Sequence, residues 1–202
     1  MKLKQSESKK LLEFLSKQKN IPLVYGFDKL GWHKDEDNML FVLPSQVIGD
    51  QQDKHYDYNP DHYAPSQNAL NAAGTLEDWQ NYVFGACTDN PLPLFALGVA
   101  FAAPLMRLFN VDGGGFHFWG ASSRGKTLVL QIAASVWGNA SDPAQLSDGT
   151  LIQRWNTTAN ALEGTALAFN DLLLPMDELG TSSIKNFGQA IYQLSGGTGK
   201  QA

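Results

Sequence analysis

Apolar residues near the start of the chain recur at helical spacing. Within residues 5–18, Leu11, Leu12 and Leu15 fall on one side, and Phe14 lies next to them. Spacings of three and four residues are typical of a helix with one apolar face. The pattern therefore predicts a short amphipathic helix here.

The next stretch changes to short runs of β-forming residues. Glycine and charged residues separate these runs and are typical of turns. The runs predict strands at 23–25, 30–33 and 39–43. Residues 49–68 are polar and acidic and contain two prolines, so they predict a long surface loop. Residues 1–70 are therefore expected to form a small α+β region.

Two helices are predicted next. Thr75 is a suitable N-cap for a helix over 76–87, whose apolar face would consist of Trp79, Tyr82 and Val83. The second, over 92–109, is apolar on most sides, which predicts a buried core helix. Its apolar run is shorter than the roughly 20 residues that a membrane span requires, so we expect no membrane partner.

From residue 115 onward, strand-like and helical segments alternate. We expect strands at 115–119, 151–155 and 172–176, and helices at 126–137, after Thr157 and after Thr181 or Ser182. Gly138 is expected just beyond the first of these helices, at its C′ position. Alternation of this kind predicts an α/β domain over 71–202, with a mostly parallel sheet and flanking helices.

Composition narrows the class of protein. The chain has 202 residues, 43% of them hydrophobic, which suits a globular protein with a real core. The net charge is −5, although residues 1–20 hold six lysines and only two glutamates. An acidic body argues against nonspecific wrapping of nucleic acid, and we expect the basic start to be a solvated helix. The single cysteine, Cys87, excludes an internal disulfide and agrees with a cytoplasmic location.

One segment matches a phosphate-binding loop in full, between a predicted strand and a predicted helix. It reads G-A-S-S-R-G-K-T and fits the pattern G-x-x-x-x-G-K-[ST]. The two glycines allow backbone angles at which N–H groups point at anionic oxygens, and the helix N-terminus adds positive potential. The predicted nucleotide-binding residues are Gly120, Ala121, Ser122, Ser123, Arg124, Gly125, Lys126 and Thr127.

Within this loop, Lys126 would neutralise the β- and γ-phosphates, and the Thr127 hydroxyl would ligate Mg²⁺. The strand at 172–176 ends in Asp177 and Glu178, which parallel pairing would bring to the same edge of the sheet as the loop. We expect Asp177 to hold Mg²⁺ through water and Glu178 to polarise the attacking water. Pro175 complicates this strand, because proline is uncommon in central strands.

Two further basic residues carry open alternatives. Arg124, inside the loop, is expected near the nucleotide. Arg154 either reaches a neighbouring subunit's nucleotide or nucleic acid, or is an ordinary surface residue.

Several stretches together resemble the domain of unknown function 927 family. They include GTLEDWQ (74–80), GGFHFWGASSRGKT (114–127), RWNTTANALEG (154–164) and LPMDELG (174–180). That family looks like helicase-type P-loop ATPases related to the primase-helicases of phages, plasmids and integrated elements. The resemblance implies ATP-driven action on DNA in an oligomeric ring, with nucleotide contacts at Gly120 to Thr127 and metal and water roles at Asp177 and Glu178. From the motifs and the resemblance together, we expect Lys126 and Glu178 to be the catalytic residues.

The sequence therefore predicts a Mg-ATP-binding module of a helicase-like ATPase from a mobile element. Only three strands of the core are evident, so the sheet is expected to be incomplete and ATP turnover by these residues slow or absent. One alternative is a non-enzymatic protein-interaction module that retains the loop. Another, a nucleotide kinase or GTPase-like switch, ranks last because no Asn-Lys-x-Asp motif follows Glu178.

Overall fold

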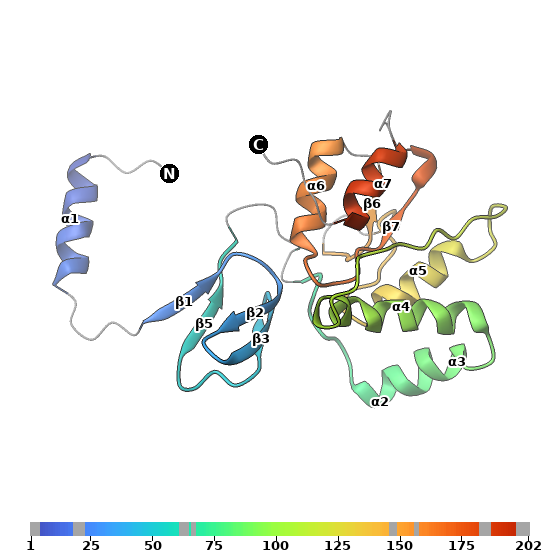
Figure 1. Cartoon of the computed structure of the whole chain (residues 1–202), viewed down its shortest axis with the longest axis horizontal. Helices are drawn as coiled ribbons and strands as arrows, with labels where there is room; N and C mark the ends of the chain where they lie inside the picture. Colours follow the sequence, from blue (N-terminus) through green and yellow to red (C-terminus); the bar gives the residue numbers. More distant parts are fainter. Residues whose placement is uncertain are drawn as a thin grey trace.

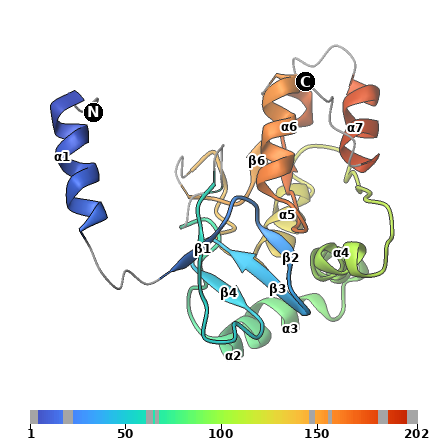
Figure 2. The same cartoon turned by 60° about the vertical axis from the view of Figure 1, so that its left-hand side comes forward.

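The computed structural model describes residues 5–17, 23–60, 65, 68–145, 149–155, 158–181 and 187–196. An N-terminal helix, a group of short strands and a larger α/β part follow one another along the chain (Figure 1). The predicted first helix is confirmed as α1, Gln5–Ser16. It stands apart from the rest in both views, with Leu12 and Phe14 exposed (Figures 1 and 2).

The three predicted N-terminal strands are present, within two small sheets. One pairs β1 (Val24–Phe27) with β5 (His55–Tyr58) in parallel; the other is an antiparallel meander of β2 (Gly31–Asp35), β3 (Asn38–Leu43) and β4 (Gln46–Ile48). The prediction of a loop throughout 49–68 is wrong at β5. There Tyr56 is buried, and its backbone pairs with Tyr25.

The helix predicted after Thr75 is confirmed, with a π-helical centre. It comprises α2 (Leu76–Asp78), η1 (Trp79–Phe84) and α3 (Gly85–Cys87). Thr75 caps it, because its hydroxyl oxygen accepts from the Asp78 amide at 3.1 Å. Trp79 points toward α5 and donates to Ser135 Oγ, but Tyr82 is exposed, which corrects the predicted apolar face. Cys87 is buried at the end of α3.

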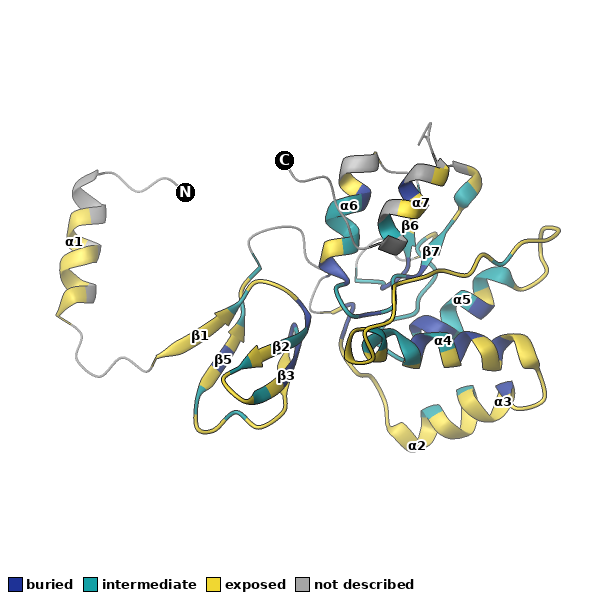
Figure 3. Cartoon of the chain, viewed as in Figure 1, coloured by how far each residue is buried: buried dark blue, intermediate teal, exposed yellow. Residues whose placement is uncertain are grey.

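The helix predicted over 92–109 is α4, Pro91–Leu108, which packs on α5 (Figure 1). Full burial was predicted and is wrong, because one face carries exposed apolar side chains, among them Phe101 and Leu105 (Figure 3). Among the described residues, α4 is the one helix long and apolar enough to cross a membrane, by length and composition alone. The expected lack of a membrane partner stays a prediction.

A proline inside α4 is accommodated by two tryptophans. Pro104 lacks the N–H that would bond to the Ala100 carbonyl, and Trp137 Nε1 donates to that oxygen instead, at 3.0 Å. The Pro104 carbonyl accepts from Trp32 Nε1 at 2.7 Å. Hydrogen bonds from the indoles of Trp137 and Trp32 thus join α4 to the segment after α5 and to β2.

The last part has the predicted helix and strand alternation, with one exception. Its elements are α5 (Lys126–Ala134), β6 (Gln153–Arg154), α6 (Ala159–Ala168), β7 (Met176–Asp177), η2 (Leu179–Thr181) and α7 (Phe187–Gly196). β6 and β7 pair in parallel, so the chain is a mixed α/β protein as predicted. Residues 115–119, predicted as a strand, have no regular secondary structure and join none of the sheets that the described residues form. The glycines at 113–115 make ordering a strand here costly, and in the part of the chain that the structure describes no neighbouring strand pairs with it.

The caps of the last two helices are predicted at Thr157 and at Thr181 or Ser182. The cap of α6 is Thr158, whose hydroxyl oxygen accepts from the Ala161 amide at 3.2 Å, so α6 begins one residue later than predicted. Thr157 and Ser182, named above as caps, lie outside the described residues.

One apolar core joins residues from the N-terminal sheets to residues of the α/β part. It contains Leu30 and Phe41 on one side and Leu151, Ile152 and Phe169 on the other.

Gly138 lies where a connecting segment passes the end of α5. That helix ends at Ala134, so Gly138 is not its C′ residue as predicted. A Cβ atom at Gly138 would overlap the Ala69 carbonyl oxygen, which also accepts from the Asn139 amide at 2.9 Å. The glycine is therefore required for close backbone approach.

Candidate functional site

The glycine loop, residues 120–125, turns the chain from the segment 111–119 into α5. Gly120 and Gly125 have φ of 150° and 78°, and Ser123 has φ of 58°. Gly125 is the N-cap of α5 and adopts the left-handed conformation. These angles are rare for residues with side chains, which explains the two glycines of the motif.

Lys126 is the first residue of α5, and its side chain folds back onto the loop. Its Nζ donates to the carbonyl oxygens of Gly120 and Ala121, at 3.0 and 2.7 Å. The ammonium therefore lies against the loop backbone, in the part of the motif where phosphate was predicted. These carbonyl contacts hold the positive charge at the N-terminal end of α5.

Thr127 and Asp177 come together from segments far apart in the sequence. The Thr127 hydroxyl donates to Asp177 Oδ2 at 3.0 Å, and both side chains are partly buried. Parallel pairing places Asp177 opposite Arg154, at the end of β7 that faces α5. The structure thus brings together the two residues predicted to hold a metal ion.

Glu178 follows Asp177 in the left-handed conformation, with φ of 60°. Its amide donates to Asp177 Oδ1 at 2.8 Å, so both carboxylate oxygens of Asp177 accept hydrogen bonds. Its own carboxylate lies 3.6 Å from Arg154 Nε. Arg154 therefore contacts the predicted catalytic carboxylate of its own chain, at an exposed position.

Pro175 is buried directly before β7, and its carbonyl accepts from the Gln153 amide at 2.9 Å. The Trp155 amide donates to the Asp177 carbonyl at 3.1 Å. The proline thus lies at the entrance of a very short strand and does not interrupt it. This resolves the difficulty that Pro175 posed for the predicted strand.

The remaining predicted loop residues, Ala121, Ser122, Ser123 and Arg124, are exposed. The segment before the loop is mostly exposed (Figure 3), with Trp119 at 85%. Two of its side chains are packed: Phe116 lies edge-on against Phe95, and the half-buried Phe118 packs on the core between α4 and α5. No group of three or more His, Cys, Asp or Glu side chains suited to a metal occurs among the residues that the structure describes.

Sequence reasoning missed a polar cluster beside the site. Asp171 lies six positions before Asp177 and binds both the N-terminal sheets and α4. The signal was available, because Asn170 and Asp171 interrupt an otherwise apolar run from Phe169 to Leu174. Polar residues inside such a run indicate a specific partner.

The family profile described as Domain of unknown function (DUF927) matches residues 1–202. The chain belongs to the DUF927 family. The resemblance inferred from the sequence motifs is therefore confirmed. A search of curated proteins finds no match to this DUF927 chain.

A solved structure named "SCCmec type IV Cch - active helicase" is similar to this DUF927 chain. The two share 22% sequence identity, with a TM-score of 0.72 over 97% of the present chain. At this identity the likeness shows the fold alone. The match spans 37% of the helicase chain, so the DUF927 chain corresponds to about a third of that protein.

Proposed function

We propose that this DUF927 chain is the Mg-ATP-binding module of a helicase-like ATPase that acts on DNA, encoded by a mobile element. The observation that carries the proposal is the hydrogen bond between Thr127 and Asp177 beside the glycine loop. Two residues predicted independently, from different motifs, meet at hydrogen-bond distance. A glycine-rich turn with a merely structural role would not require that meeting.

The donor set suits magnesium. Mg²⁺ prefers oxygen ligands in octahedral geometry, with adjacent ligand oxygens about 2.9 Å apart. Thr127 Oγ1 and Asp177 Oδ2 are separated by 3.0 Å. These two side chains would hold Mg²⁺, directly or through one of its waters, and the ion would supply charge neutralisation for the phosphates.

Lys126 has a second role in the proposal. Its ammonium rests on two loop carbonyls and would exchange them for phosphate oxygens, a stronger charge-assisted interaction. Glu178 would orient the attacking water, and Arg154 holds its carboxylate near the end of β7. The helicase-like role and the DNA partner rest on family membership and on the similarity to a structure named as a helicase. A ring oligomer and a cytoplasmic location stay predictions.

Calorimetry with Mg-ATP tests the proposal. The wild-type chain should bind, and Lys126→Ala should weaken binding about 100-fold, equivalent to about 2.7 kcal/mol. Lys34→Ala removes an exposed lysine from β2 and is the matched control, expected to bind as wild type does. Binding that survives in Lys126→Ala would contradict the assignment, and no heat from the wild type would favour the non-enzymatic alternative.

A further inference from the structure

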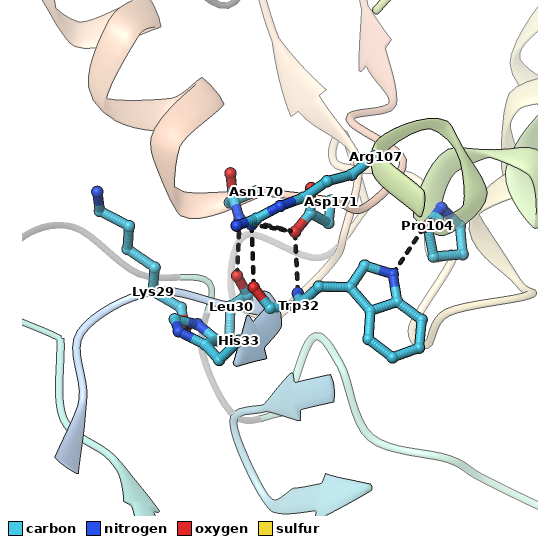
Figure 4. A network of polar contacts seen from close by, with 8 residues as sticks. All are labelled: Lys29, Leu30, Trp32, His33, Pro104, Arg107, Asn170 and Asp171. Carbon is cyan, nitrogen blue, oxygen red and sulfur yellow. Dashed lines mark hydrogen bonds and ion pairs between the residues drawn. The ribbon is translucent and has the colours of Figure 1, made fainter. Parts of the chain in front are cut away.

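Asp171 lies at a junction of three segments, shown in Figure 4. Its Oδ2 accepts hydrogen bonds from the Trp32 amide at 2.9 Å, from Arg107 Nη1 at 3.0 Å and from Asn170 Nδ2 at 3.1 Å. The Asp171 side chain is only 10% exposed. One carboxylate oxygen therefore joins the start of β2, the end of α4 and the turn after α6.

The same segments are tied by a second set of bonds. Arg107 Nη1 also donates to the Trp32 carbonyl at 2.9 Å, and Asn170 Nδ2 donates to the Leu30 carbonyl at 2.9 Å. A Cβ atom on Gly31 would lie 2.5 Å from Asp171 Oδ2, so a glycine is needed for this approach. Gly31 and Asp171 both have positive φ, 88° and 57°. The local backbone is thus shaped around the contact.

From this junction, two packed routes lead to the Thr127–Asp177 pair. Along α4, the buried Ala96 and Ala100 pack against Val129 and Ala133 of α5, the helix that begins with the lysine and threonine of the motif. Along the chain, Asp171 is followed by an apolar segment, residues 172–175, that leads directly into β7. The junction is therefore connected to both elements of the proposed metal site, to α5 through α4 and to β7 through residues 172–175.

We propose that Asp171 is a positioning residue, through which docking of the N-terminal sheets sets Asp177 relative to Thr127. The expected effect on the Mg²⁺ dependence of nucleotide binding rests on the proposed function, whereas the coupling between Asp171 and Asp177 does not. Loss of the Asp171 charge weakens the bonds to Trp32 and Arg107, so the segment before β7 is held less firmly. Asp177 then meets Thr127 less often, although the glycine loop and Lys126 are intact.

The first test needs no nucleotide. Asp171→Asn is compared with Asp35→Asn, a matched control whose carboxylate accepts from Lys54 and Tyr56 within the N-terminal sheets. Hydrogen exchange is followed at the Gln153 and Trp155 amides, which donate to residues 175 and 177. At equal distances below each melting temperature, exchange in Asp171→Asn should be about tenfold faster than in the control, the factor for a lost charged hydrogen bond. Equal rates in the two variants would overturn the coupling.

The second test measures ATP affinity in EDTA and in Mg²⁺. Asp171→Asn should leave the EDTA affinity unchanged and lower the gain from Mg²⁺ about tenfold, again by one charged hydrogen bond. A parallel loss under both conditions would mark a merely structural role and contradict the inference. If the wild type binds no ATP, the proposed function and the Mg²⁺ consequence are both wrong, and the exchange rates alone decide the coupling. Arg107→Gln removes the same ion pair from its exposed side and replaces Asp171→Asn if that variant does not fold.

Discussion

The ion pairs of Asp35 and Glu36 with Lys54 are formed within the N-terminal part, whereas the residues beside the glycine loop depend on a distant strand. Asp35 of β2 accepts from Lys54 Nζ at 2.7 Å and from the Tyr56 hydroxyl of β5, and Lys54 lies directly before β5. The segment before the loop is mostly exposed and joins none of the sheets that the described residues form, and Thr127 bonds to Asp177, 50 positions away. The comparison teaches that the site's geometry is imposed by α5 and β7, not by the loop itself.

The largest effect should come from breaking the close backbone contact between Gly138, after α5, and Ala69. Gly138→Ala places a methyl group on the Ala69 carbonyl oxygen, a backbone atom that cannot rotate away. We expect a loss of about 1–3 kcal/mol in the free energy of unfolding, measured by urea denaturation. Gly98→Ala is the control, because nothing lies within 4 Å of its Cβ position in α4, and it should stabilise by about 0.5–1 kcal/mol. Equal effects in the two variants would refute the steric argument.

Removal of the N-cap of α6 tests how much this helix, which precedes β7 in the chain, contributes to stability. Thr158→Ala removes the side-chain acceptor of the Ala161 amide and should cost about 1 kcal/mol. Thr75→Ala is a matched change, because it removes the corresponding side-chain acceptor at the cap of α2. Thermal denaturation compares the two. A Thr158→Ala variant as stable as wild type would mean that the α6 cap contributes nothing.

A single hydroxyl tests the dependence of the loop on β7. Thr127→Val removes the donor to Asp177 Oδ2 and keeps the shape of the side chain, so we expect a loss of about 0.5–1.5 kcal/mol. Thr127→Ser keeps the hydroxyl and should also keep the Mg²⁺ dependence of ATP binding. Urea denaturation measures the stability loss, and calorimetry measures the Mg²⁺ dependence. A valine variant with unaltered Mg²⁺ dependence would separate this residue from the metal site.

The smallest effect concerns the pH dependence of stability that arises from the Asp35–Lys54 ion pair. The hydrogen bond from Lys54, followed by that from Tyr56, lowers the pKa of Asp35 below its ordinary value of 3.8. Because the folded pKa is lower than the unfolded one, this stabilisation is present at neutral pH and is lost as pH falls below about 4. The difference in unfolding free energy between wild type and Asp35→Asn should therefore shrink in acid. A difference that is constant with pH would rule out the ionised pair as its source.

The pKa of the partner, Lys54, is shifted in the opposite direction, so its contribution to stability is lost in alkali and not in acid. The hydrogen bond to Asp35, followed by that to Glu36, raises the pKa of Lys54 above its ordinary value of 10.5. Its contribution is therefore complete at neutral pH and is lost only in strong alkali.

Helices were predictable because their signals are local. Caps such as Thr75, and apolar spacing within one segment, located α1, α4 and α5 to within a few residues. β5 was missed because its partner β1 lies about thirty residues earlier, although Tyr56 and Tyr58 alternate with polar residues in a strand-like way. The prediction of a strand at 115–119 was wrong because its aromatic pattern is strand-like, but a strand also requires a neighbouring strand to pair with.

The site was predictable where a motif fixes the backbone. The glycines of the loop indicated its positive φ angles, and the end of an apolar run located Asp177. The interruption of an apolar run by Asn170 and Asp171 indicates that they have specific partners, but not which ones, because Trp32 and Arg107 lie in different elements and nothing in the sequence links them to Asp171. The sequence does not decide between the alternatives for Arg154, because its contact with Glu178 depends on a strand pairing of only two residues.

The buried sulfur of Cys87 has a practical consequence for studying this chain. It is the only cysteine in the sequence and is 2% exposed, so thiol reagents are expected to react with it very slowly in the folded protein. A cysteine introduced at Trp119 or Ser123 would be labelled selectively by a fluorophore. Fluorescence from those positions would then report directly on the loop when nucleotide is added.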